Sequence, residues 1–252
     1  MKDTENNKLT NIGTQKLCLA IKKLKDISGE IPLSAFATFA FRELENREEV
    51  KTIILKETGV AVEILSGKDE AECDFAGLKN EIGENKSGVG VDLGGGSAQI
   101  FSFKKGTLDF CESYPIGCKK IKENFVQGVF PTISEEKKIK EYIENVFSGF
   151  DKYSEKIYIM GGTAKTAAKM YSFLKGEEID DIFVENIPQL IKFIEEAPED
   201  VMKNVLKARY DNIVVGIIIM ETIAKKCGAK IINIKKCSVR DGYIINRDIK
   251  NT

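Results

Sequence analysis

Apolar positions along this chain follow two spacings, which predicts a mixture of helices and strands. Leu17, Ile21 and Leu24 are separated by four and three residues, the spacing of one face of a helix, and predict a helix over about 14–27. The short apolar run at 61–65, with glycine close by on either side, predicts a buried strand instead. Helical and strand periods therefore both occur within the first quarter of the chain.

The same two spacings, together with turn and cap residues, divide the rest of the chain into short elements. Asn46, followed by Glu49 three residues later, resembles a helix N-cap with its capping-box partner, and Gly59 marks the end of that helix. We expect strands at about 32–38, 61–65, 88–92, 98–103, 107–113, 157–160 and 231–234, and helices at about 46–59, 66–78, 116–127, 134–149, 161–170, 186–196, 208–226 and from 239.

Strands that alternate with helices predict an α/β protein, and the hairpins at 88–113 predict a mixed sheet. The polar run 83–87 is the best boundary, so we expect a truncated first domain over 1–87 and a second α/β domain over 88–252. The second domain has enough strands for a complete sheet, whereas the first has two. We expect the first domain to be small and incomplete, with an exposed apolar edge.

The stretch from Gly88 to Ile100 carries the clearest chemical signal. Val89 and Val91 lead to Asp92 at the end of a strand, and Gly94, Gly95, Gly96 and Ser97 follow before the next strand. Glycines allow backbone N–H groups to converge on an oxyanion, and the aspartate lies where a divalent cation would neutralise a phosphate. A plain glycine-rich hairpin is the alternative interpretation. Three glycines between Asp and Ser favour a phosphate clamp.

Three further features could bind or act on phosphate. Gly161, Gly162 and Thr163 follow a strand and open a helix, whose N-terminal N–H groups suit an anion, although a helix simply capped by Thr163 is equally consistent. Glu70 belongs to the first turn of a helix, where acids also serve as dipole partners at the surface. Arg42 follows an apolar run and is expected at the end of a strand, within reach of a phosphate, unless it is an ordinary surface arginine.

Composition restricts the possible chemistry. The chain has 252 residues, a net charge of −1, 42% hydrophobic residues, six cysteines without a C-x-x-C pair, and no histidine. The absence of histidine excludes Ser-His-Asp and Cys-His catalysis, and the charge gives no attraction to nucleic acid or anionic lipid. The sequence shows neither a signal segment nor an apolar run of about 20 residues. We expect a cytoplasmic protein that works through carboxylates, Lys or Arg, backbone amides and a metal.

The order of these motifs resembles that of the exopolyphosphatase/guanosine pentaphosphate phosphatase (Ppx/GppA) family. The resemblance runs in order from about residue 10 to 248, at family-like spacing. The matching segments are Ala37-Thr38-x-Ala40-x-Arg42 with Asn46-Arg47-x-Glu49, Ser66-Gly67-x-x-Glu70-Ala71, Asp92-x-Gly-Gly-Gly-Ser97, Pro115-x-Gly117, Gly161-Gly162-Thr163-Ala164, Arg209-x-Asp211-x-Ile213-x-x-Gly216 and Val239-Arg240-Asp241-Gly242.

The resemblance implies a two-domain actin-like ATPase (ribonuclease H-like) fold with mixed sheets. It also implies a phosphatase that removes terminal phosphate from inorganic polyphosphate or guanosine pentaphosphate. Asp92 would help to hold Mg²⁺, or Mn²⁺ in its place, Glu70 would act as general base on the attacking water, and Arg42 would contact substrate phosphate. The glycine loops at 94–97 and 161–163 would bind phosphate. We expect no nucleic-acid or membrane partner, and leave a homodimer open.

Two departures from the family pattern leave alternatives open. The family's initial strand, phosphate loop and returning strand are not found ahead of the helix at 14–27, so the chain is either a fragment or a shortened member. Gln99 stands where the family usually has glutamate, and Glu72 replaces the arginine after Ala71. A catalytically impaired phosphate- or nucleotide-binding protein on the same fold is therefore the competing function. A sugar- or acetate-kinase-like activity is a third alternative, which is disfavoured because Glu70 and the surrounding segments follow the phosphatase order and no separate sugar-binding signature is visible.

Overall fold

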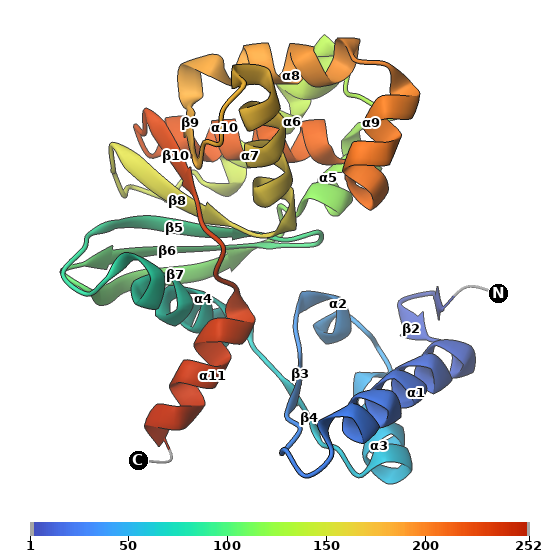
Figure 1. Ribbon diagram of the computed structural model, residues 1–252. Helices are drawn as coiled ribbons and strands as arrows, with labels where there is room; N and C mark the ends of the chain where they lie inside the picture. The colour runs from blue at the N-terminus through green and yellow to red at the C-terminus, as the bar shows by residue number, and fades with distance from the viewer. Residues whose placement is uncertain (1–2, 251–252) are drawn as a thin grey trace. The chain divides into compact units, whose positions relative to one another are not determined.

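The computed structural model describes residues 3–250, which form two compact units that divide between Asp69 and Glu70 (Figure 1). Helix α4 (Gly67–Ile82) begins at this division, so most of it clusters with the second unit. The predicted boundary at residue 87 would instead have assigned the whole of α4 to the first unit. Ser66 and Asp69 exchange side-chain-to-backbone hydrogen bonds of 3.1 and 3.0 Å, which start the helix.

The described residues of the first unit, before α4, form two small sheets and three helices. Its chief sheet is a parallel pair, as expected from a unit with two substantial strands, and helices α1 and α3 pack together through Cys18, Val50 and Ile54. Apolar side chains remain exposed on α1, where Leu24 and Ile27 are 53% and 81% accessible. The elements are β1 (Thr4–Glu5), β2 (Lys8–Leu9), α1 (Asn11–Ser28), β3 (Ala35–Ala37), α2 (Phe39–Arg42), α3 (Arg47–Thr58) and β4 (Val62–Ile64).

One local prediction for the first unit was wrong, and a second holds only in part. Arg42 ends the short helix α2 and not a strand, because the Thr38 carbonyl accepts hydrogen bonds of 3.0 Å from the amides of Phe41 and Arg42 and turns the chain. Asn46 is the N-cap residue of α3, as predicted, but its side chain makes no capping hydrogen bond, since it binds the backbone N–H and C=O of Leu9 instead. The helix ends at Gly59 in the left-handed conformation, as predicted.

The second unit is built on one mixed sheet in the order β7-β6-β5-β8-β10-β9. Strand β8 is parallel to both β5 and β10, while β6, β7 and β9 run antiparallel to their neighbours. The elements are β5 (Gly88–Leu93), β6 (Ala98–Lys104), β7 (Thr107–Tyr114), α5 (Cys118–Phe125), α6 (Ile133–Val146), β8 (Lys156–Met160), α7 (Gly162–Lys175), β9 (Asp181–Phe183), α8 (Ile187–Glu196), α9 (Glu199–Leu206), α10 (Ile213–Lys226), β10 (Ile231–Ile234) and α11 (Val239–Lys250).

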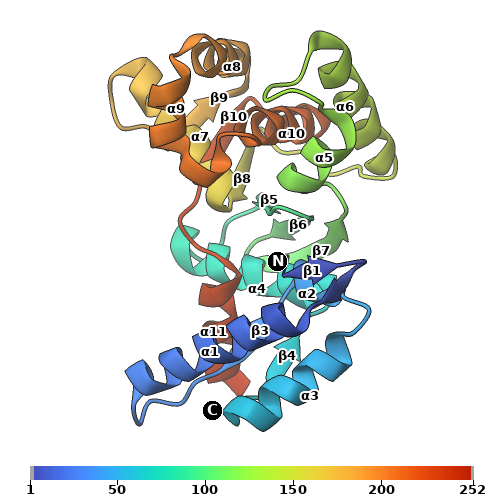
Figure 2. The same cartoon turned by 90° about the vertical axis from the view of Figure 1, so that its right-hand side faces the viewer.

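Both faces of this sheet are covered, which gives a three-layer unit (Figures 1 and 2). Alternate residues such as Val89, Val91 and Ile159 pack into the large core beneath α5 to α10, whereas Phe101 and Met160 face the opposite side with Leu78 of α4. Helix α10 is buried along most of its length, but no helix among residues 3–250 is both long and apolar enough to cross a bilayer.

Helices α4 and α11 cross at very short distance on the second face of the sheet. A side chain on Gly242 would overlap the carbonyl group of Cys73, and one on Gly77 would crowd the Ser238 carbonyl oxygen at 3.1 Å. Two glycines therefore permit the contact that holds α11 against α4.

Candidate phosphate and metal site

Asp92 lies near the end of β5, where the sequence placed it, and the chain returns through the Gly94–Ser97 turn into β6. Across this hairpin Asp92 pairs with Gln99, and on its other side it pairs with Met160 of β8. The alternation along a strand then places the side chains of Asp92 and Gln99 on the same face of the sheet.

The peptide groups of the glycine turn are oriented by the N-terminus of α5. The Gly94 carbonyl accepts from the Cys118 amide at 3.0 Å, and the Gly95 carbonyl accepts from the amides of Lys119 and Lys120 at 2.9 and 3.0 Å. In a trans peptide the N–H points opposite to the C=O, so the N–H groups of Gly95 and Gly96 point away from α5. Neither donates to another group in the described residues, which leaves two adjacent donors for an anion.

Ser97 and Gln99 support this turn from inside. Ser97 is buried, and its hydroxyl accepts a hydrogen bond of 2.9 Å from Gln99 Nε2, which also donates to Ser113 Oγ at 3.0 Å. The Gly94 amide closes the turn by donating to the Ser97 carbonyl at 3.0 Å. The Ser97 hydroxyl is thus engaged within the protein, and the turn offers backbone amides to a ligand.

The second glycine loop meets the first at Asp92. Gly161 has a φ of +104°, and a Cβ built on it would lie 2.6 Å from the Leu93 carbonyl oxygen and 2.8 Å from Asp92 Oδ1. Gly161 is the N-cap of α7, so the first N–H groups of that helix have no partner within it. Thr163 is not the cap; it is buried, and its hydroxyl bonds the thiol of Cys118. Asp92 therefore lies beside a helix N-terminus suited to an anion.

Arg209 adds a positive charge at the same loop. A side chain on Gly162 would overlap the Arg209 guanidinium, which follows α9 in a short 3₁₀ turn. The guanidinium also favours the thiolate of Cys118, although burial dominates and raises the pKa of that thiol to about 11. The cysteine is accordingly a neutral packing residue at neutral pH, and the arginine is the charged group here.

Three carboxyl groups influence one another below the glycine loops. Burial and the Glu70 charge raise the pKa of Asp92 to about 6, and Lys165 on α7 opposes that rise. Glu70 is only 6% exposed, so it is not the solvated surface acid that its position in a first helical turn allows. Asp74, one turn further along α4, is completely buried, and its pKa is raised by burial, Asp92 and Glu70.

The expected cation has to be held with few protein ligands. Among residues 3–250 no three Asp, Glu or Cys side chains lie close enough together to hold a metal ion. Mg²⁺ commonly binds through one or two carboxylates and completes its octahedron with water and substrate phosphate oxygens. Asp92 fits this pattern of Mg²⁺ binding. Burial and the charge of Glu70 disfavour its ionised form, and a bound cation would favour that form.

The structure thus brings together most of the expected site residues within the second unit: Glu70, Asp92, the Gly94–Ser97 turn and Gly161 to Thr163. Arg42 belongs to the first unit, where its Nη1 donates to the Leu65 carbonyl at 2.6 Å. The role of Arg42 toward phosphate stays a prediction, as do the roles of the other residues.

Sequence reasoning gave no role to Asp74, Lys165 or Arg209. Asp74 had a signal, because positions 71, 74, 75 and 78 form one helical face on which the other three residues are apolar or small. An acid on an otherwise apolar face of a helix is expected to be buried, as Asp74 is. Lys165 follows the motif 161–164, and Arg209 begins the motif 209–216. Nothing in their spacing distinguishes them from the other lysines and arginines as side chains near the glycine loops.

Known proteins resemble this chain in sequence and in fold. The Mycobacterium bovis "Exopolyphosphatase 1" is 33% identical over 120 residues, which are 46% of this chain and 35% of that protein. The matched region of the chain thus spans about a third of the length of that relative. The Mycobacterium leprae "Exopolyphosphatase 1" is 23% identical over 261 residues, covering 96% of this chain and 76% of the relative.

Solved structures share the whole fold. The Aquifex aeolicus member of the Ppx/GppA family has a TM-score of 0.85 at 22% identity, covering 100% of this chain and 86% of that one. An exopolyphosphatase from Cytophaga hutchinsonii has a TM-score of 0.83 at 20% identity, covering 96% and 84%. The α/β fold with a mixed sheet is therefore the actin-like ATPase fold of these proteins. The Ppx/GppA phosphatase family model matches residues 1–250, and the chain belongs to this family.

Proposed function

We propose that this protein hydrolyses terminal phosphoanhydride bonds, with inorganic polyphosphate or guanosine pentaphosphate as substrate. The observation that carries the proposal is the meeting of two glycine turns at one carboxylate, since a Cβ on Gly161 would lie 2.8 Å from Asp92 Oδ1. The amides of Gly95 and Gly96 and the N-terminus of α7 would bind phosphate oxygens. The relatives named exopolyphosphatases support polyphosphate as the first substrate to test.

In this proposal Glu70 is the general base. A water oxygen attacks the terminal phosphorus while Glu70 accepts one of its protons, and the bond from phosphorus to the bridging oxygen breaks. The bridging oxygen keeps the electron pair and leaves on the shortened chain, so orthophosphate is the other product. Glu70 is buried and its charge acts on the carboxyl group of Asp92, which supports a role for Glu70 at the same site. Mg²⁺ or Mn²⁺ held at Asp92 would supply neutralisation of phosphate charge.

The test is orthophosphate release from defined polyphosphate and from guanosine pentaphosphate, with and without Mg²⁺ or Mn²⁺. Glu70→Gln keeps the shape of the side chain but cannot accept the proton, and should lower turnover by about 10²–10⁴-fold. Glu72→Gln is the matched control two residues along α4 and should leave turnover unchanged. Full activity of the Glu70→Gln protein would remove Glu70 from the reaction.

A second candidate is a catalytically impaired protein that binds phosphate-rich ligands on the same fold. Gln99 favours it, because this neutral, buried amide shares a face with Asp92 where the family usually has a carboxylate. Calorimetry with tripolyphosphate separates the two: binding without orthophosphate release supports the second candidate, whereas release that depends on Mg²⁺ and Glu70 supports the first.

A further inference from the structure

A buried cysteine links the two glycine loops. Cys118 is the first residue of α5 and is 1% exposed. Its amide donates to the Gly94 carbonyl at 3.0 Å, and the hydroxyl of the buried Thr163, at the start of α7, hydrogen-bonds its thiol. Cys118 therefore contacts the first loop through its backbone and the second loop through its side chain.

The start of α5 packs directly against the first loop. A Cβ on Gly117 would lie 2.3 Å from the Gly95 carbonyl carbon and 2.3 Å from the Gly96 nitrogen, so α5 touches the peptide group between these two glycines. The Gly95 carbonyl also accepts from the amides of Lys119 and Lys120 at 2.9 and 3.0 Å. A shift of α5 would therefore move the two amides that the turn offers to an anion.

Helix α10 holds the cysteine and the threonine together. A Cβ on Gly216 would lie 2.2 Å from Thr163 Cγ2 and 3.1 Å from Cys118 Sγ. The two side chains thus meet over one point of α10, where a residue larger than glycine would crowd both. Because α10 is buried along most of its length, it provides a fixed base for this contact.

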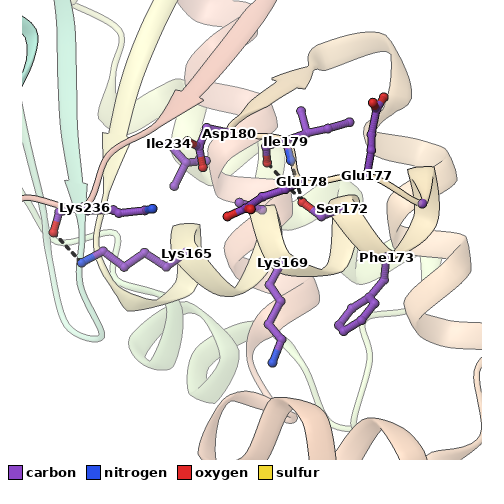
Figure 3. Close-up of a pocket in the computed structure, with 12 residues that line it drawn as sticks. Lys165, Lys169, Ser172, Phe173, Glu177, Glu178, Ile179, Asp180, Ile234 and Lys236 are labelled. Atoms are coloured by element: carbon purple, nitrogen blue, oxygen red, sulfur yellow. Dashed lines mark hydrogen bonds between the residues drawn. The ribbon is translucent and has the colours of Figure 1, made fainter.

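Other contacts of α7 attach this helix elsewhere. Lys165 Nζ donates to the Lys236 carbonyl oxygen at 2.7 Å, beside a pocket that α7 forms with the segment 176–180 and the end of β10 (Figure 3). In the same pocket the Ser172 hydroxyl accepts from the Ile179 amide at 3.0 Å. These hydrogen bonds fix α7 to the segments that follow α7 and β10, and not to the first glycine loop.

Gly161 also brings the two loops together, but ahead of the turn. A Cβ on Gly161 would lie 2.6 Å from the carbonyl oxygen of Leu93, which precedes the glycines of the turn. The amides offered to an anion belong to Gly95 and Gly96, at the point where α5 packs on the turn. Their position relative to the start of α7 therefore depends on the contact between Cys118 and α7.

We propose that Cys118 is a positioning residue of the phosphate site, which sets the distance between the Gly94–Ser97 turn and the N-terminus of α7. Phosphate groups of one ligand can then bind amides of both loops. Thr163 acts through Cys118, and the loop 161–163 binds the ligand through its backbone. This inference rests on the proposed function, since it takes phosphate as the ligand of the two loops.

Calorimetry with tripolyphosphate and Mg²⁺ tests the proposal on the full chain carrying Glu70→Gln, which should not consume the probe. Cys118→Ala removes the thiol and should weaken binding about tenfold, a factor that corresponds to about 1.4 kcal/mol and lies within the net contribution of one hydrogen bond. Cys118→Ser keeps an atom that can accept from Thr163, and should bind within about threefold of the unchanged protein.

Cys227 provides the matched control. It is 0% exposed and lies just after the last residue of α10, at the end opposite to Gly216. Cys227→Ala should therefore lose stability as Cys118→Ala does, because both remove a buried thiol, but it should keep the affinity for tripolyphosphate. Urea unfolding measures both losses of stability.

A double variant shows whether the cysteine acts through Thr163. Thr163→Val keeps the branched shape but removes the hydroxyl, and should weaken binding about as much as Cys118→Ala does. The protein with both substitutions should bind within about twofold of the weaker single variant, since both remove the same contact. Should Cys118→Ala fail to fold, Thr163→Val takes its place in the comparison with Cys227→Ala.

Equal affinity of the Cys118→Ala and Cys227→Ala proteins would overturn the proposal, and so would losses that add in the double variant. Hydrogen exchange without ligand covers the case in which the unchanged protein binds no tripolyphosphate, a result that would count against the proposed function. Cys118→Ala should then speed exchange at both the Gly94–Ser97 turn and the start of α7, and Cys227→Ala at neither. The same exchange in both variants would contradict the role of Cys118.

Discussion

Asp74 has an electrostatic cost that the fold does not offset. Its side chain is completely buried, and neither carboxyl oxygen has a hydrogen-bond partner in the described residues. Burial and the charges of Asp92 and Glu70 raise its pKa well above the ordinary value of 3.8. The native state therefore holds a proton on Asp74 over a pH range in which the unfolded chain has lost it.

From this follows a prediction for pH. Because the folded pKa of Asp74 is raised, the contribution of Asp74 to the free energy of unfolding should be highest in acid and fall as pH rises from about 4 through the folded pKa. Asp74→Asn cannot ionise, so it should lose this dependence and exceed the unchanged protein at pH 8 by about 1–3 kcal/mol. Urea unfolding at pH 5 and pH 8 measures the difference. Asp200→Asn, at an exposed acid, should change neither value, and equal slopes for all three proteins would contradict the prediction.

Gln99 allows a second prediction at this scale. The hydroxyls of Ser97 and Ser113 now accept from its amide, and by rotating they could donate to a carboxylate in the same place. Gln99→Glu should therefore fold normally and add a charge beside Asp92 for the cation, raising Mg²⁺-dependent turnover by about 10²-fold. Orthophosphate release against Mg²⁺ concentration measures it. Gln99→Ala, which loses both hydrogen bonds, should gain no turnover, and an inactive Gln99→Glu protein would show that another group limits the reaction.

Residues near one another in sequence were placed well, and their distant partners were not. Asp92 at a strand end follows from the alternation of Val89 and Val91, which needs only local pattern. Asn46 stands at the predicted N-cap position, but its side chain binds Leu9, 37 residues away, and that contact competes with capping. The burial of Glu70 likewise depends on what packs over the first turn of α4. No local signal contains that information.

Among the elements, the strands of the second unit were predicted almost completely because their apolar runs are separated by glycine or polar turns. Strand β9 was missed, since three residues without alternation carry no period. The predicted helix at 208–226 begins later, at Ile213, because a 3₁₀ turn at Lys207–Arg209 and the non-helical Asn212 precede it. Helix α9 was also missed. Short elements contain too few residues to show a helical or strand period, so their conformation depends on tertiary contacts.

The two ends of α7 provide a matched pair of glycines for a prediction. Gly161→Ala should destabilise the protein by about 2–5 kcal/mol, because a Cβ there adds left-handed strain and overlaps Leu93 and Asp92. Gly176 also has a positive φ, of 77°, but no atom lies within 4 Å of its Cβ position, so Gly176→Ala should cost about 1–2 kcal/mol from strain alone. Urea unfolding compares the two. Equal losses would mean that Gly161 is not packed against Asp92.

At the scale of the whole molecule, the collinear order of motifs predicted the family and the fold, while the division into units needed the structure. The polar run 83–87 suggests a boundary after α4, and only packing shows that most of α4 clusters with the second unit. The two units also differ in how much apolar surface they bury. The first has a small cluster around Cys18, Val50 and Ile54, and the second has a continuous core over its sheet.

This difference predicts unequal stability. A unit with a two-stranded parallel sheet, a small core and exposed Leu24 and Ile27 should open locally well before the sheet of the second unit unfolds. Hydrogen exchange followed by mass spectrometry should show α1 and α3 exchanging at least about tenfold faster than β5, β6 and α10, since about 1.4 kcal/mol of opening free energy is a tenfold difference. Tripolyphosphate with Mg²⁺ should slow exchange around the Gly94–Ser97 turn and the start of α7. Uniform exchange across both units would mean that they unfold as one, in spite of their separate cores.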